Sequence, residues 1–590
     1  MHLLYGLYYY TAHIQGENNH ATTIQKRNPC REAPPNAENG DVYIYERRTK
    51  YNPSTQKTQT IGKKLIGKIP KGETAMVPTR PKKPAGSRTR AAGAVPGVRT
   101  TRQRTGLTDI LELLGRESGI DGDIRACFPA GDAEKLVSVA RYWVATGGHT
   151  LPRMAAWQVM HPVPYPGVVS VDVASDLFGG VGVNEEAIQG VFRRRAGRLG
   201  KGAALAFDST TVSSWSEQIG EVRPGFNKDG DGLDVTKILT LYAEEEEDPI
   251  AFAGQPGNIP DVTAIENTLE QLGALGLDDP TVVTDNGFYS QKNLARFHRR
   301  GRKFLTLVDT RVAWVREAVE GVRERLDDGD AICPFDPETC GTTLVRAEHV
   351  YEPENKKAGV PALTGTLHLH VFRSLQLRAK QEVAFNQRLS EVKGLLEEGG
   401  ELGESAERWS QKYLETQEED GRRAVAFRNE AIREAKRGFG VFALATNRQM
   451  PTFRALELYR LRNGLEDHWG QGKRYCDGRR TRCHGGDVLH GRQFAQFAAL
   501  CYRAAFARKL KAIKATLAAP PPGKTAAKLQ LEKKLLGWLE AHSVQDIFDW
   551  FDCIQTTTVE TPAGHYRWST ESVSRDRLFL TLLGLTPPVS

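Results

Sequence analysis

The alternation of strand-like and helix-like segments between residues 203 and 308 is the feature that most constrains the fold. Short apolar runs and helical spacings of apolar residues follow one another in the order strand, hairpin, helix, strand, helix, strand: 203–208, 234–242 with 249–253, 261–275, 281–285, 291–300 and 303–308. This order predicts an α/β layered core. The acidic run that joins the two hairpin strands, Glu244 to Asp248, is expected to be a solvated turn.

The rest of the chain predicts several further regions, because 590 residues exceed one ordinary core. Strand-like segments at 41–51 and 64–68 indicate a β-rich start, and helical periodicity fills 106–200. After the core come two strand-like stretches, 343–351 and 365–374, one long charged helical tract, 375–437, a strand at 439–445 and a helix from 452. The predicted regions are a β-rich segment (1–78), a basic linker (79–105), a helical domain (106–200), the first part of the core (201–310), an insertion (311–436), the second part of the core (437–510) and a helical tail (511–590).

The distribution of charge is more informative than its sum. Lys and Arg number 80 against 72 acids, a mild excess of +8. From Arg80 to Arg104, however, there are eight basic residues and no acid, and a second cluster holds Arg193, Arg194, Arg195, Arg198 and Lys201. Such clusters suit a polyanion, although a solvated face explains either cluster equally well when it is taken alone. Eight scattered cysteines and the lack of any long apolar run predict a cytoplasmic protein that does not enter membranes.

Two aspartates each end a predicted strand of the core, Asp208 after 203–207 and Asp285 after 281–284. Ligand sites in open α/β sheets gather at the carboxyl ends of strands. Carboxylates at such an edge can hold Mg²⁺, which prefers oxygen ligands. Taken alone, either aspartate also fits a polar strand-to-loop turn.

The helix predicted after Pro451 favours the chemical interpretation. It carries Tyr459, Arg462, Glu466 and Lys473, which a helix of ~100° per residue places within about 60° of one another. An ion-paired exposed face is the alternative, since Arg462 and Glu466 are four residues apart. A solvated face would not need Tyr459. The helix also tolerates Gly464, Gly470 and Gly472, for which close approach to a backbone or to DNA is one reason.

The spacing of these four residues resembles the Tyr-Arg-Glu-Lys signature of the DDE transposases of the insertion sequence four group. A chance match at a fixed start is on the order of 10⁻⁵ at average residue usage. Other segments resemble the same family: Phe207 to Thr210, Gly257 to Asp261, Asp285 to Phe288, Leu444 to Asn447 and Asp41 to Pro70. The resemblance covers most of the chain, and it is strongest over 203–310 and 438–510.

The resemblance implies an RNase H-like core in which Asp208, Asp285 and Glu466 are the catalytic, metal-binding triad. Its cofactor would be Mg²⁺, as two ions, with Mn²⁺ able to substitute. Tyr459, Arg462 and Lys473 would bind phosphates of double-stranded DNA. The implied activity is cut-and-paste transposition: cleavage at terminal inverted repeats and strand transfer into target DNA, by a homodimer in a synaptic complex associated with the nucleoid.

Region 106–200 and the basic linker are candidates for binding the terminal repeats. Two alternatives remain open at this stage. One is an RNase H-like nuclease without strand transfer, and the other is an inactive DNA-binding derivative of a transposase.

Overall fold

A computed structural model of the chain describes residues 25–32, 40–52, 57–78, 97–277, 279–351, 362–419 and 422–587. It divides into two compact units, Met1–Val98 and Arg99–Ser590, which are considered separately. None of the helices in the described ranges combines the length and the apolar character that a membrane crossing requires.

The first unit is an antiparallel four-stranded sheet. Its strands follow chain order: β1 (Gln25–Glu32), β2 (Val42–Asn52), β3 (Lys57–Ile69) and β4 (Val77–Pro78). The strands predicted at 41–51 and 64–68 are present as β2 and as the end of β3. Residues 1–24 of the predicted β-rich segment and residues 79–96 of the predicted linker lie outside the described residues.

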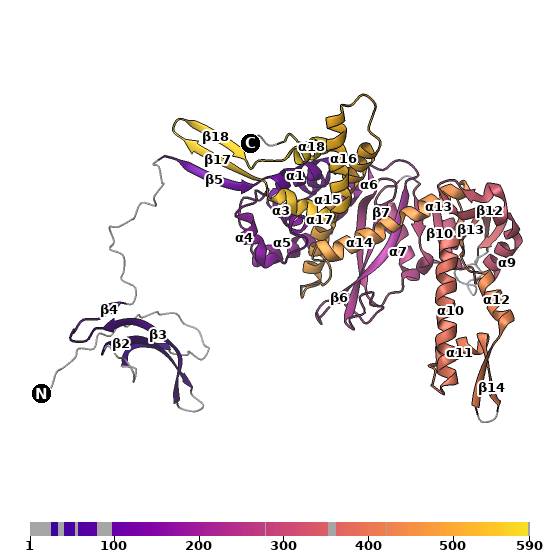
Figure 1. The fold of residues 1–590 in the computed structure, drawn as a ribbon, viewed down its shortest axis with the longest axis horizontal. Coiled ribbons are helices and arrows are strands. Elements are labelled where there is room, and N and C mark those ends of the chain that lie inside the picture. The colour runs from indigo at the N-terminus through magenta and orange to yellow at the C-terminus, as the bar shows by residue number, and fades with distance from the viewer. Residues whose placement is uncertain are drawn as a thin grey trace. The chain divides into compact units, whose positions relative to one another are not determined.

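The second unit is built on a mixed nine-stranded sheet, ordered β11-β12-β13-β16-β10-β9-β6-β7-β8. Figure 1 labels β6, β7, β10, β12 and β13 of this sheet. Its strands are β6 (Ala204–Ser214), β7 (Asp234–Ala243), β8 (Asp248–Pro256), β9 (Thr281–Thr284), β10 (Lys303–Val308), β11 (Ile332–Cys333), β12 (Asp336–Tyr351), β13 (Leu363–Ser374) and β16 (Val441–Thr446). Strands β6, β9 and β10 run parallel, and the other neighbours pair antiparallel. The predicted α/β pattern is therefore present, and strands from 311–436 extend the same sheet.

Helices before and between these strands cover the sheet. The first group is α1 (Gly106–Glu117), α2 (Ile120–Cys127), α3 (Ala130–Thr146), α4 (Met154–Gln158), α5 (Val171–Gly182) and α6 (Glu185–Ala196). The second group is α7 (Asp261–Ala274), α8 (Gln291–Arg299) and α9 (Ala313–Val322). The first group packs around the long helix α15 (Gly486–Ala518), which also contacts β8, so these helices share one apolar core with the sheet.

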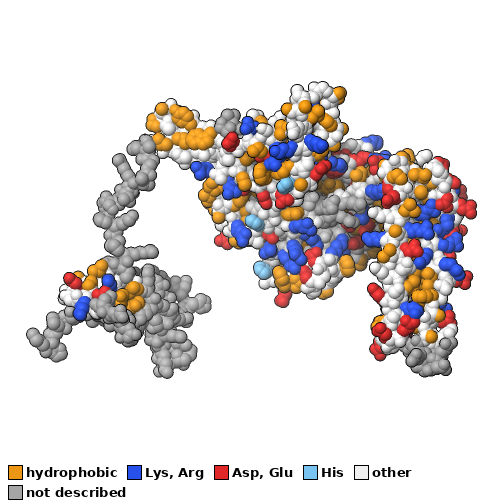
Figure 2. All heavy atoms as spheres, in the orientation of Figure 1, with side chains coloured by type: hydrophobic (Ala, Val, Ile, Leu, Met, Phe, Trp, Pro, Cys, Tyr) orange, Lys and Arg blue, Asp and Glu red, His pale blue; other side chains and the backbone are white. Residues whose placement is uncertain are grey.

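The charged tract 375–437 is not one helix, contrary to the sequence prediction. It forms α10 (Leu375–Glu397), α11 (Glu404–Tyr413), the hairpin β14 (Leu414–Glu419) with β15 (Arg422–Phe427), and α12 (Asn429–Arg437). Tyr413, Leu414 and Val425 are buried with Leu389 and Val392 of α10. This packing overrides the helical propensity of the charged residues around it. On the face shown in Figure 2, acidic and basic side chains are mixed over this region.

The C-terminal part contributes α13 (Thr452–Leu461), α14 (Asn463–Tyr475), α15, α16 (Ala526–Ala541), α17 (Val544–Asp552) and α18 (Ser574–Leu583). It also contains the hairpin β17 (Gln555–Thr561) and β18 (Gly564–Ser569). Strand β5 (Arg99–Arg104) pairs with β17, so the end of the predicted linker is a strand. A partner more than 450 residues away in the chain cannot be seen in local sequence.

Candidate active site

Asp208 and Asp285 come together where β9 ends beside β6. Asp208 lies within β6 and does not end this strand, contrary to the sequence prediction. The register pairs Phe207 of β6 with Thr284 of β9, and the two aspartates are the residues that follow. The Asp208 carboxylate accepts a bond from the backbone N–H of Ser209 at 2.8 Å. Asp285 accepts one from the N–H of Gly287 at 2.9 Å. β9 ends at Thr284 while β6 continues to Ser214. The two acids therefore lie at the point where the pairing of β6 with β9 ends.

Asp208 is held in surroundings that disfavour its negative charge. Burial raises the pKa of Asp208 to about 6, and the nearby charge of Asp285 acts in the same direction. The cations Lys228 and Arg462 and the Ser209 N–H oppose this rise. Two like charges in a poorly solvated place favour a bound cation, because it lowers the free energy of the ionised pair.

The carboxylate oxygens of Asp208 and Asp285 thus suit a divalent ion by their chemistry. Among the side chains that the structure describes, no three His, Cys, Asp or Glu residues gather closely enough to hold a metal. The side chain of Glu466, the third predicted ligand, lies outside the described residues. The convergence of all three carboxylates therefore remains a prediction.

The backbone that carries Glu466 lies against the strand that carries Asp208. Leu465 is buried in a cluster with Ala206 of β6 and Tyr242 of β7. Nη1 of Arg462 lies 3.7 Å from Oδ2 of Asp208. Because side chains alternate along a strand, Ala206 and Asp208 share the face that α14 covers. Helix α14 is therefore anchored beside the aspartate pair.

The helix predicted over Tyr459 to Lys473 is interrupted, so that prediction is wrong in part. Helix α13 ends at Leu461 and α14 begins at Asn463, with Arg462 between them. The N–H of Leu465 bonds to the carbonyl of Arg462 at 2.9 Å, a tighter turn than an α-helix makes. Gly464 lies within this turn, and glycine weakens a helix interior by about 1 kcal/mol relative to alanine.

Tyr459 and Arg462 still form one group across this break. The guanidinium of Arg462 lies 5.5 Å from the ring centre of Tyr459, within the range of a cation–π contact. Arg462 is only 8% exposed. Tyr459 is half-buried against the cluster of α13 with β9, β10 and β16. This pair therefore holds a positive charge beside Asp208.

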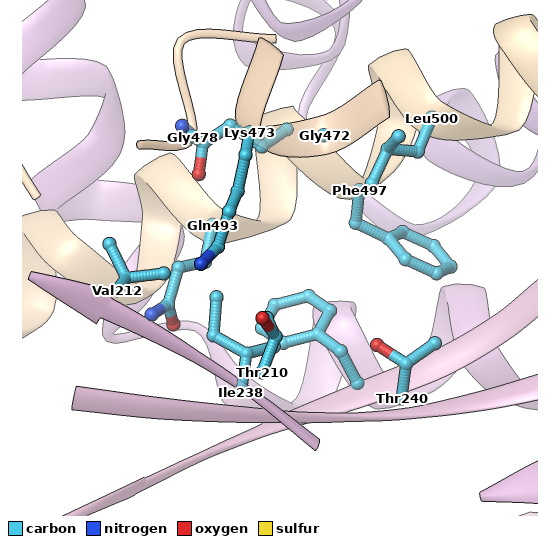
Figure 3. A pocket seen from close by; sticks show the side chains of 12 residues that line it. Thr210, Val212, Ile238, Thr240, Gly472, Lys473, Gly478, Gln493, Phe497 and Leu500 are labelled. Carbon is cyan, nitrogen blue, oxygen red and sulfur yellow. The ribbon is translucent and has the colours of Figure 1, made fainter. Parts of the chain in front are cut away.

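Lys473 is engaged within the protein. Its Nζ donates to Oδ1 of Asp229 at 3.0 Å, and both side chains are largely buried. Figure 3 shows Lys473 reaching from α14 toward the sheet, into a small, mostly apolar pocket whose lining includes Thr210, Ile238 and Phe497. The predicted phosphate ligand thus has an internal carboxylate partner in this state.

Among the glycines of α14, Gly472 allows close packing between helices. A Cβ on Gly472 would lie 3.2 Å from a methyl carbon of Leu500 on α15. A Cβ on Gly478 would lie 2.7 Å from the carbonyl oxygen of Gly472. The close approach expected at Gly472 is therefore to α15 and the chain after α14.

Most residues of the second basic cluster, 193–201, form ion pairs within the protein. Arg195 is buried and pairs with Asp248, while Arg194 and Arg198 pair with the buried Asp123. Further along, Arg492 is also buried and donates to Asp477 at 2.6 Å. Arg195 links α6 to β8, whereas Arg194 and Arg198 link the end of α6 to α2. The expectation that this cluster faces a polyanion is therefore wrong for the buried Arg195.

The acidic run 244–248 contains the predicted turn, but only Glu245 of it is exposed, so the prediction that the turn is solvated is wrong in part. Its members pair with basic residues of α6, α13 and α15: Glu245 with Arg454, Glu247 with Lys511, and Asp248 with Arg195 and Arg508. Glu244 is 1% exposed, and its carboxylate oxygens have no hydrogen-bond partner among the described residues. Helices from distant parts of the chain therefore cover this turn in part and bury Glu244.

Three residues near the aspartates were not found by sequence reasoning. Lys228, in the β6–β7 connection, donates from Nζ to the carbonyl of Ser209 at 2.6 Å. Asp229 holds Lys473, as described above. Asp261 accepts from Ser209 Oγ at 2.9 Å and from Lys237 at 2.8 Å. The motif Gly257 to Asp261 was a signal for Asp261, but no local pattern marks the other two.

The chain is similar to a known family of proteins and to solved structures. A family model described as "Transposase DDE domain" matches residues 200–502. One of the solved structures is the cryo-EM structure of the piggyBac transposase synaptic complex with hairpin DNA. It has 9% sequence identity and a TM-score of 0.34, and the match covers 75% of this chain and 82% of that one. No curated protein matches the chain.

Proposed function

This chain belongs to the transposase DDE domain family, and from that premise we propose that it cuts and joins DNA with Asp208, Asp285 and Glu466 as its metal-binding acids. The observation that carries the proposal is the placement of Asp208 and Asp285 on neighbouring parallel strands, with Arg462 beside Asp208. Paired carboxylates next to a guanidinium suit a phosphodiester, which needs both charge neutralisation and positioning.

The residues divide into those that hold metal and those that hold DNA. Asp208, Asp285 and Glu466 would hold Mg²⁺ or Mn²⁺, which when bound supplies positive charge to the phosphate and to the attacking and leaving oxygens. Arg462 and Lys473 would bind phosphate oxygens as charged donors, and Tyr459 would donate its hydroxyl. The burial of Asp208 strengthens the charge interactions around it.

The finer assignments follow the sequence resemblance. We propose membership of the insertion sequence four group, with an RNase H-like core interrupted by the insertion 311–436. The substrates would be double-stranded terminal inverted repeats and a target duplex, and bringing two ends together implies a homodimer. The region 106–200 is a candidate for reading the repeats.

The decisive experiment uses purified full-length protein, MgCl₂ and duplexes copied from the inverted repeats that flank the gene. A labelled end duplex and a supercoiled target plasmid should yield both cleaved ends and joined products. Omission of divalent ions should abolish both products. A protein that cleaves ends but never joins them would be the RNase H-like nuclease of the first alternative.

Binding without chemistry would identify the second alternative. An inactive derivative should shift end duplexes in an electrophoretic assay, yet give no cleavage with Mg²⁺ or Mn²⁺. A wild-type protein that neither binds nor cleaves end duplexes would contradict the proposal as a whole.

Substitution of Asp229 should strengthen DNA binding. Asp229→Asn removes the carboxylate that occupies Lys473, and the amide preserves its shape. If Lys473 is a phosphate ligand, affinity for end duplexes at low salt should rise about fivefold, since a part-exposed ion pair contributes roughly 1 kcal/mol. Fluorescence anisotropy measures this change. A loss of affinity would mean that Asp229 positions Lys473 instead of competing with DNA.

A further inference from the structure

The connection between β6 and β7 carries a lysine against the open edge of β6. Nζ of Lys228 donates to the carbonyl oxygen of Ser209 at 2.6 Å, and Ser209 directly follows Asp208. β9 no longer accompanies β6 at this point, because β9 ends at Thr284. The ammonium therefore lies beside the aspartate pair, along the part of β6 that β9 no longer accompanies.

The position of Lys228 is fixed by several hydrogen bonds. Its own N–H donates to Oγ1 of Thr211 at 3.1 Å. The preceding Asn227 donates from Nδ2 to Oγ of Ser213 at 3.2 Å and to Asp231 at 2.6 Å. Asp231 in turn pairs with Arg480 at 2.7 Å. The segment Asn227 to Asp231 is thus fastened along β6, which limits the entropy that Lys228 would lose on binding a ligand.

The ammonium of Lys228 keeps donor capacity for a ligand. A lysine ammonium has three donors, and one of them is used on the Ser209 carbonyl. No carboxylate of the described residues lies within ion-pair distance of it, whereas Lys473 and Arg480 are both paired with acids. The side chain is exposed at the surface. Lys228 also opposes the rise in the pKa of Asp208, which places its charge near that carboxylate.

We propose that Lys228 is a further DNA-phosphate ligand of the active site, contacting the strand that passes the Asp208–Asp285 edge. This inference rests on the proposed function. A fixed ammonium beside the acids would hold a neighbouring phosphate in place, while Arg462 approaches Asp208 from the break between α13 and α14. Lysine suits this role as a compact point charge.

The test compares salt dependence of binding for Lys228→Met, Lys228→Arg and a control. Each neutralised phosphate contributes about 0.9 to the slope of log K against log salt, and loss of one contact should lower the slope by that amount. Lys228→Met should show this loss with end duplexes in the absence of divalent ions, and Lys228→Arg should restore the wild-type slope. Lys533→Met, an exposed lysine of α16, should match wild type.

The outcomes separate this inference from the proposed function. If wild type cleaves and joins DNA but Lys228→Met has the wild-type slope, Lys228 is not a phosphate ligand and the transposase proposal stands. If wild type fails to cleave, the proposed function fails whatever the slope. Thermal unfolding of each variant checks its folding. If Lys228→Met unfolds at a lower temperature than wild type, the test rests on Lys228→Arg. A Lys228→Arg slope below the wild-type slope then overturns the inference.

Discussion

Asp208→Asn and Asp285→Asn should each reduce DNA strand cleavage by at least about 1,000-fold while leaving DNA binding nearly intact. A thousandfold loss corresponds to ~4 kcal/mol of transition-state stabilisation, a reasonable cost for removing one carboxylate of a metal-holding set. Asn keeps the shape and removes the charge, so folding should be retained. Cleavage of a labelled end duplex under single-turnover conditions measures the effect.

A matched control is available at the same edge of the sheet. Asp309 follows β10, the next parallel strand after β9, and it pairs with Arg311 within its own turn. Asp309→Asn should therefore cleave at close to the wild-type rate. The double variant Asp208→Asn/Asp285→Asn should be no slower than either single variant, because groups that act as a unit are not additive. Additive losses, or full activity in either single variant, would remove the two aspartates from the reaction.

Local sequence was sufficient to place the two aspartates. Each ends a short apolar run, and a run of this length is typical of an inner strand of a layered sheet. The pairing of Phe207 with Thr284 then brings the acids together without any further information. The same holds for Arg462, whose spacing from Tyr459 survives the break between α13 and α14 because the backbone at Arg462 stays helical.

Long-range packing decided the features that sequence reasoning missed. The acids of 244–248 look solvated in local sequence, and it is basic residues of α6, α13 and α15 that draw them into ion pairs. Lys228 lies in a connection with no periodicity, so nothing in its neighbours indicated that it would return to β6. The hairpin β14–β15 forms because its apolar residues meet α10, a contact that a local reading of charge does not include.

Glu244→Gln should stabilise the protein at pH 9 and have little effect at pH 5. Burial raises the pKa of Glu244 to about 8, against the positive charges of Arg462 and Arg454. In the unfolded chain the carboxyl ionises near its ordinary pKa of 4.5. Between these values the folded state holds a proton that the unfolded state has released. Stability is therefore lost progressively as pH rises from about 4.5 to about 8, and it stays lower above that range.

The difference between the folded and unfolded pKa of Glu244 sets the size of this effect. At ~1.4 kcal/mol for each pKa unit, the free energy of unfolding should rise by roughly 3 to 5 kcal/mol at pH 9. Unfolding followed by tryptophan fluorescence at both pH values measures it. Glu245→Gln is the matched control, because Glu245 is part-exposed and paired with Arg454, and it should change stability little at either pH. Equal destabilisation of Glu244→Gln at both pH values would mean that Glu244 is ionised and holds Arg462. A neutral Glu244 instead leaves the charge of Arg462 directed at Asp208 and at the phosphate that we expect beside it.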